Sequence, residues 1–267
     1  MYQLGFIGAG NMASAILGGV LGSGVLAPQQ ICAADINPER CRAFSEKGVS
    51  VLQSGTQVVK DSQFILLAVK PQNVEEVLGK AAAAFAPDKV VISIAAGVSA
   101  NCIRRLLQCE EAKIVLVMPN TPLLIGEGSV AVSRSDGVGD EEFLFAKSLF
   151  SSAGKVEEIP PSLMNEVIPI NGSSPALIYL LAKIVSEYSE KKGIPYETAN
   201  RLFCQALIGS AQMMLQSGKS HQELIDMVTS PGGTTYKMLD GLNECGFAHA
   251  VEDSFDRCIK RAYELGK

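Results

Sequence analysis

The chain has 267 residues, of which 47% are hydrophobic and 19% are charged, and its net charge is −5. This composition is typical of a globular protein, and the length allows one large domain or two ordinary ones. No run of Lys or Arg is present, which argues against nucleic acid and anionic membranes as main partners. The N-terminus lacks a basic signal-peptide segment and no apolar run is long enough to span a membrane, so we expect a cytoplasmic protein.

The first part of the chain alternates apolar runs with helical segments. We predict strands at residues 3–7, 30–35, 63–69, 89–97 and 113–119, with weaker strand patterns at 129–134 and 154–159. Unbroken apolar runs are typical of parallel strands that are covered on both faces. One predicted helix follows the glycines at 8–10, and another, at 38–48, ends at a glycine. The pattern predicts an α/β fold, with a doubly wound parallel sheet of Rossmann type over residues 1–160.

Residues 161–267 have a different pattern and are predicted to form an all-helical domain. A helix at 175–193 carries one apolar stripe, formed by Leu177, Leu180, Leu181, Ile184, Val185 and Tyr188. A second helix, at 196–218, is apolar around much of its circumference. Such a helix needs cover on several sides, which a small helical domain cannot supply. We therefore expect a partner subunit that packs against this domain.

Residues 8–13, with the sequence GAGNMA, follow the first predicted strand and open a helix. This is the G-x-G-x-x-A pattern of a dinucleotide-binding turn. The first glycine permits the tight turn, the second lets the backbone approach a pyrophosphate, and the free N–H groups of the helix N-terminus bind that anion. The predicted cofactor-binding residues in this turn are Gly8, Ala9, Gly10, Asn11 and Met12.

Asp35 ends the second predicted strand and bears on the choice of cofactor. A carboxylate in this place accepts hydrogen bonds from ribose hydroxyls, which favours NADH, and repels the 2′-phosphate of NADPH. Asn37 and Arg40 follow closely, however, and Arg40 can meet that phosphate if Asp35 turns away. The sequence leaves NADPH and NADH both open.

The ends of three further strands are candidate parts of the cofactor site, because ligands of open α/β sheets bind at the carboxyl ends of the strands. These ends read AVKPQ (68–72), IAAG (94–97) and VMPNTP (117–122). Asn120 and Thr121 have groups that suit a carboxamide or a ribose, with turn capping as the alternative. The predicted cofactor contacts here are Ala68, Val69, Lys70, Pro71, Ala95, Ala96 and Asn120.

Other kinds of chemistry find little support in the sequence. The seven cysteines form no C-x-x-C pair, and the two histidines lie in no motif, so we predict no metal site and no disulfide framework. No nucleophile elbow or Walker A loop is present. The remaining reaction is hydride transfer, in which the protein positions a nicotinamide cofactor and a substrate.

The stretch SPGGTT (230–235) is the candidate substrate site. We expect Pro231 in the first turn of a helix, capped by Ser230 or Thr229. Glycines leave the N–H groups at such a helix start uncovered, and threonines add hydroxyl groups, so the site suits a carboxylate. The predicted substrate-binding residues are Ser230, Gly232, Gly233, Thr234 and Thr235.

The motifs GFIGAGNMASAI, AVKPQ, AAG, MPNTP, GSSPA and SPGGTT occur in the order and at the spacing of the pyrroline-5-carboxylate reductases. The chain resembles that family from residue 4 to about residue 262. The resemblance implies an oxidoreductase of proline biosynthesis that reduces the C=N bond of 1-pyrroline-5-carboxylate with NAD(P)H and gives L-proline. It also implies homodimers with interlocked helical domains, and decamers of five such dimers. In this family the SPGGTT loop binds the substrate carboxylate and its second threonine bonds the ring nitrogen, so Thr235 is the predicted catalytic residue.

Four positions depart from the family pattern, among them Ser174, which replaces a glycine, and Leu177, which stands where tyrosine is common. Leu116 stands where many members have arginine, and Asn171 takes a serine position. These departures keep two alternatives open: a nucleotide-binding regulatory paralogue without turnover, and a reductase of another cyclic imine or of a 3-hydroxy acid. Relatives that act on 3-hydroxy acids use a lysine of the inter-domain helix, and this chain has Lys183 in that region.

Overall fold

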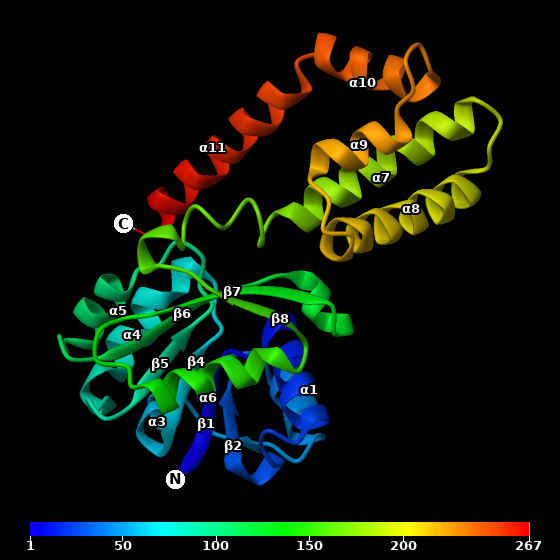
Figure 1. Ribbon diagram of the computed structural model, residues 1–267. Helices are drawn as coiled ribbons and strands as arrows, with labels where there is room; N and C mark the ends of the chain where they lie inside the picture. The colour runs from blue at the N-terminus through cyan, green and yellow to red at the C-terminus, as the bar shows by residue number, and fades with distance from the viewer. Residues whose placement is uncertain (267) are drawn as a thin grey trace. The chain divides into compact units, whose positions relative to one another are not determined.

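The computed structural model describes residues 1–266 (Figure 1). The chain divides into two compact units. The first contains residues 1–175 together with the chain from residue 258 onward, and the second contains Ala176–Arg257. The domain boundary predicted between residues 160 and 161 stays a prediction.

The first unit is built around one eight-stranded sheet with the order β3-β2-β1-β4-β5-β6-β7-β8. The strands are β1 (Tyr2–Ile7), β2 (Ile31–Ala34), β3 (Ser50–Val51), β4 (Ser62–Leu67), β5 (Val90–Ser93), β6 (Lys113–Pro119), β7 (Gly128–Arg134) and β8 (Gly154–Glu158). The chain leaves β1 in one direction through β2 and β3, and returns to the other side of β1 at β4. The doubly wound α/β fold predicted from the sequence is confirmed.

Helices cover both faces of this sheet (Figure 1). They are α1 (Asn11–Ser23), α2 (Pro38–Ser45), α3 (Gly55–Asp61), α4 (Val74–Ala81), α5 (Ala100–Leu107) and α6 (Asp140–Ser151). Alternate strand residues point into different cores: Phe6 and Leu66 pack with α1, α2 and α6, whereas Ile65 and Leu67 pack with α3, α4 and α5. Burial on both faces explains why these strands are apolar without alternation.

The second unit is helical. Its elements are α7 (Ser174–Lys191), α8 (Tyr196–Gln216), α9 (His221–Val228), α10 (Thr234–Glu244) and the first part of α11 (Phe247–Leu265), whose residues from Cys258 onward belong to the first unit. Gly193 follows α7 with φ +89°, so the predicted helix end is confirmed. Within residues 176–257, all of which the structure describes, only Ser186 and Ala199 are buried.

Two features of the sheet were not predicted from the sequence: the existence of β3 and the direction of β7. β3 has only two residues, too few to give a pattern. β7 pairs antiparallel with β6, so the sheet is not parallel throughout. Residues 120–127, which join these strands, are too few for the crossover of a dozen or more residues that a parallel pair requires.

The start of α10 differs from the prediction. Pro231 and Gly232 form a turn in which the Gly233 N–H donates to the Ser230 carbonyl, at 2.9 Å, and Gly232 has φ +72°. Proline followed by glycine with positive φ is the signature of a type II turn. Helix α10 begins afterwards, at Thr234, with Gly233 as its N-cap. The expectation that Pro231 occupies the first helical turn, capped by Ser230 or Thr229, was therefore wrong.

A glycine contact that joins α11 to the sheet allows a stability test. Gly97 has φ +81°, and a methyl group added there would collide with the backbone carbonyl of Ala262. We expect Gly97→Ala to lower the free energy of unfolding by about 2–4 kcal/mol, since strain and overpacking add. Gly126, with φ +80° and no atom within 4 Å of the added methyl group, is the matched control. Gly126→Ala should cost only about 1 kcal/mol in urea unfolding, and equal losses would contradict the collision.

Candidate active site

The predicted cofactor residues of the first unit follow the ends of β1, β2, β4, β5 and β6, which lie at one edge of the sheet. The Gly8 N–H donates to the Ala34 carbonyl at 2.8 Å, and the Ala68 N–H donates to the Ile7 carbonyl at 2.8 Å. These bonds extend the parallel pairing beyond the strands. Three loops that are far apart in the sequence therefore start side by side, around β1.

Gly8 and Gly10 shape the turn after β1. Gly8 has φ +97°, and a Cβ there would lie 2.5 Å from the Ala68 carbonyl oxygen, so only glycine fits. Gly10 is the N-cap of α1 and supplies no capping side chain. The first N–H groups of this 13-residue helix, including those of Asn11 and Met12, thus have no side-chain cap. Bare N–H groups at a positive helix end fit the pyrophosphate of a dinucleotide.

The Asp35 carboxylate is tied to this turn. Its Oδ2 atom accepts from the Ala9 N–H at 2.7 Å, and its Oδ1 atom accepts from the Asn37 N–H at 2.8 Å. The side chain is only 6% exposed, and Arg40 Nη1 lies 3.8 Å from Oδ2. The structure therefore brings together Asp35 and the glycine turn, as a dinucleotide site requires.

The loop after β4 contains Ala68, Val69, Lys70 and Pro71. Ala68 and Val69 are half-buried beside the glycine turn, and Lys70 is exposed. Pro71 begins a short 3₁₀ helix, Pro71–Asn73, which ends the extended chain. The exposed ammonium group of Lys70 is free to reach an anion, so its predicted role in cofactor binding remains open to test.

Asn120 follows β6 and is 8% exposed. Its Oδ1 atom accepts from the Ser129 N–H at 2.9 Å, and its Nδ2 atom donates to the Asn171 carbonyl at 3.4 Å. The side chain holds the loop between β6 and β7 in place, which supports the turn-capping alternative. Its cofactor contact stays a prediction.

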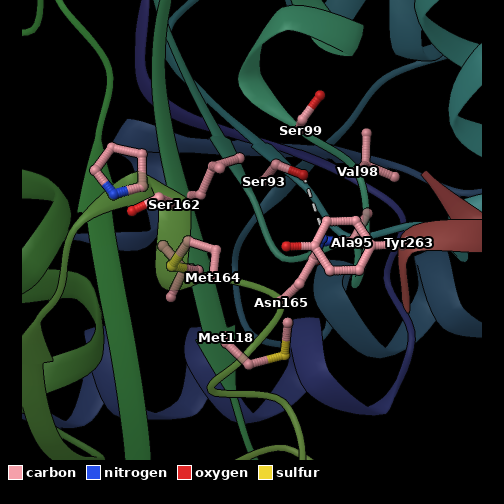
Figure 2. Close-up of a pocket in the computed structure, with 13 residues that line it drawn as sticks. Ser93, Ala95, Val98, Ser99, Met118, Ser162, Met164, Asn165 and Tyr263 are labelled. Atoms are coloured by element: carbon pink, nitrogen blue, oxygen red, sulfur yellow. Dashed lines mark hydrogen bonds between the residues drawn. The ribbon is translucent and has the colours of Figure 1, made fainter. Parts of the chain in front are cut away.

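A cavity of about 300 Å³ lies at the ends of β5 and β6 (Figure 2). Ala95, a predicted cofactor residue, lines it, whereas the half-buried Ala96 does not. Among the other lining residues are several that were not predicted as site residues: Ser93, Ser99, Met118, Ser162, Met164, Asn165 and Tyr263. The chain brings them from two strand ends, from the segment after β8 and from α11. Apart from Met118, which belongs to the MPNTP stretch, no motif marks them in the sequence.

Tyr263 adds a polar group to this cavity. Its hydroxyl donates to Glu166 Oε1 at 2.6 Å, and this bond to a carboxylate raises the pKa of the tyrosine. The other oxygen of Glu166, Oε2, is buried without a partner in the described part of the chain. The cavity lining therefore combines apolar side chains with hydroxyl and amide groups, which suits a small polar ligand.

The predicted substrate residues lie in the second unit. Gly233 packs its backbone against Ser230, since a Cβ there would lie 2.5 Å from Ser230 Oγ. Thr234 is exposed and Thr235 is half-buried, both in the first turn of α10. Gly233 caps this 11-residue helix without a side-chain hydrogen bond. The N–H groups and hydroxyls of the stretch are thus gathered at one helix N-terminus.

Comparisons with known proteins match both parts of the chain. The family model for pyrroline-5-carboxylate reductase dimerisation matches residues 161–265, and the model for NADP oxidoreductase, coenzyme F420-dependent, matches residues 3–97. The pyrroline-5-carboxylate reductase of Escherichia coli is 34% identical over 266 residues, covering 99% of this chain and 98% of that protein. The reductase of Pisum sativum is 35% identical over 264 residues, covering 99% and 96%.

A solved structure agrees over the same length. Plasmodium falciparum pyrroline carboxylate reductase, with NADP bound, aligns with a TM-score of 0.90 and 27% identity, covering 100% of this chain and 98% of that one. The chain belongs to the pyrroline-5-carboxylate reductase family. The resemblance noted in the motifs is thereby confirmed.

Two of the departures from the reductase pattern, Leu116 and Asn171, lie in well-packed parts of the first unit. Leu116 is 9% exposed, lies in β6, belongs to the buried core and lines the cavity. Asn171 is 4% exposed, and its Nδ2 atom donates to the Met118 carbonyl. This hydrogen bond connects the segment before α7 to the end of β6. It is made by the amide group of Asn171, which a serine side chain does not have.

Among residues 1–266, no group of His, Cys, Asp and Glu side chains is arranged to hold a metal ion. Over the same residues, no helix has the length and apolar character needed to cross a membrane.

The hydrogen bonds of Asn120 can be tested by substitution. Asn120→Ala leaves the Ser129 N–H and the Asn171 carbonyl without their partner, so we expect a loss of about 1–3 kcal/mol in the free energy of unfolding. The neighbouring Thr121 is exposed, and Thr121→Ala should change stability by less than about 0.5 kcal/mol. Urea denaturation of both variants measures the difference. Similar values for the two would show that the Asn120 amide contributes nothing.

Proposed function

We propose that this protein is a pyrroline-5-carboxylate reductase, which reduces the C=N bond of 1-pyrroline-5-carboxylate and releases L-proline as the last step of proline biosynthesis. The bound cofactor, NADPH or NADH, supplies the hydride. The observation that carries the proposal is the pairing, in one full-length family member, of a dinucleotide turn at residues 8–13 with an uncapped helix start at residues 230–235. The first suits a pyrophosphate and the second a carboxylate.

The proposed cofactor site uses the groups of the first unit. The N–H groups at the start of α1 bind the pyrophosphate, and the Asp35 carboxylate faces the ribose next to the turn. Ala68, Val69, Lys70, Pro71, Ala95, Ala96 and Asn120 border the rest of the cofactor. Gly8 is required for the shape of this turn, because a Cβ there would collide with the Ala68 carbonyl.

The proposed substrate site uses the groups at the start of α10. The N–H groups of Thr234 and Thr235, at the start of the helix, and the Ser230 and Thr234 hydroxyls bind the carboxylate, and the helix dipole favours its charge. The Thr235 hydroxyl donates to or accepts from the ring nitrogen and orients it. A protonated imine is already electrophilic, so positioning supplies much of the rate and little acid–base assistance is needed.

The helical unit supports a homodimer. A domain with so few buried side chains leaves apolar groups in water, among them Leu202, Ile208 and Met214, which are 66%, 53% and 48% exposed. A second copy that interlocks with the first covers such surfaces. We propose a cytoplasmic homodimer of this kind, with decamers of five dimers as the larger assembly.

The activity is tested by the loss of nicotinamide absorbance with purified protein and 1-pyrroline-5-carboxylate, run in parallel with NADPH and NADH. Turnover with either cofactor, and L-proline as product, is expected. Cofactor binding without turnover would favour the regulatory paralogue. Turnover only with another cyclic imine or a 3-hydroxy acid would identify a different reductase.

Thr235 is tested in the same assay. Thr235→Val keeps the shape of the side chain and removes the hydroxyl, so kcat/KM should fall by about a hundredfold. Thr235→Ser keeps a hydroxyl and should retain most of the rate. Thr235→Val with unchanged kcat/KM would remove the role proposed for this threonine.

A further inference from the structure

We propose that this chain prefers NADH to NADPH, and that Asp35 and Ile36, at the end of β2, set the preference. The inference rests on the proposed dinucleotide site and deepens it. A relative that is 27% identical has been solved with NADP bound, but that structure does not show which cofactor this chain prefers. The preference must come from the residues that face the 2′ position of the adenosine ribose, where the two cofactors differ by one phosphate.

The Asp35 carboxylate is fixed in place on the cofactor side of the sheet edge. Two N–H groups hold it, those of Ala9 and Asn37, at 2.7 and 2.8 Å. Each carboxylate oxygen accepts one of these bonds and keeps lone pairs for another donor. Ribose hydroxyls are donors of this kind, whereas a 2′-phosphate offers only acceptors and negative charge. Turning the carboxylate away would break both bonds.

Ile36 follows Asp35 and is 100% exposed. A site for a 2′-phosphate needs several donors or cations around the end of β2, because the phosphate carries up to two negative charges at neutral pH. Ile36 supplies neither a donor nor a cation from its side chain. Its full exposure also means that no packing in the monomer requires an apolar residue there.

The cations nearby are already paired. Arg40 lies 3.8 Å from Asp35, and Arg42 lies 3.7 Å from Glu46 on the same helix. Residues 35–40 carry two acids, Asp35 and Glu39, against the one base, Arg40. A phosphate brought to this place would therefore meet a net negative charge. To bind it, Arg40 would have to neutralise Asp35 and the phosphate together.

The preference is measured by calorimetry with NADH and with NADPH, in the absence of substrate. We expect the Kd for NADH to be at least tenfold lower than that for NADPH. Equal constants, or tighter binding of NADPH, would overturn the proposal. Because no substrate is present, this result is independent of whether 1-pyrroline-5-carboxylate is reduced. A protein that binds NADH tightly but shows no turnover would lose the proposed function and keep the proposed preference.

Ile36 offers the sharpest substitution, since a side chain that is wholly exposed can be exchanged with little effect on folding. Ile36→Arg adds a cation beside the ribose, and it should lower the Kd for NADPH about tenfold while changing that for NADH by less than threefold. Ile36→Gln has a polar side chain without the charge and is the matched control. If both variants leave the NADPH constant unchanged, Ile36 does not face the 2′ position.

Arg40 tests the opposing hypothesis. If Arg40 recognises a phosphate, Arg40→Gln should raise the Kd for NADPH tenfold or more and leave NADH unaffected. The proposal expects a rise of less than threefold for NADPH, because Arg40 is engaged with the Asp35 carboxylate and contributes little to holding a phosphate. Thermal melting of each variant without cofactor shows whether the fold is intact.

Discussion

The hydrogen bond from the Ala9 N–H to the Asp35 carboxylate is the contact on which the rest of the site depends. It joins the loop after β1 to the loop after β2, at the edge where the parallel strands end. The close approach of Gly8 to Ala68 adds the loop after β4. These contacts fix the three loops, so the uncapped N–H groups at the start of α1 keep one position relative to Asp35. A dinucleotide that binds there meets N–H groups at one end and a carboxylate at the other.

Most of this edge could be predicted from sequence because its causes are local. A strand followed by G-x-G-x-x-A predicts the turn and the helix that follows. An acid at the end of the second strand is typical of the same dinucleotide-binding fold. The hydrogen bonds of Asp35 could not be predicted, because they depend on the orientation of a side chain. The tyrosine in the cavity was also beyond prediction: Tyr263 lies 97 residues from its partner Glu166, and neither is in a motif.

The errors have equally local causes. A helix start was expected at Pro231 because proline favours the first helical turn, but Gly232 at φ +72° lets the same pair form a turn first. The consequence is chemical as well as geometric. With Gly233 at the cap, the helix begins at Thr234 and Thr235, so both threonines lie in its first turn beside the free N–H groups. The correction therefore brings the predicted substrate groups closer to one anion site.

The two units differ in how much of their structure is buried, and each contains predicted site residues. The first unit buries its strands on both faces, so its glycine turns can be held rigidly against a cofactor. The second buries almost nothing within residues 176–257 and yet contains the SPGGTT stretch. A helix start binds an anion well only when it is held in place, because ordering a mobile segment opposes binding. A second copy that covers the exposed apolar side chains would hold this stretch in place. Dimerisation and substrate binding would then depend on the same helices.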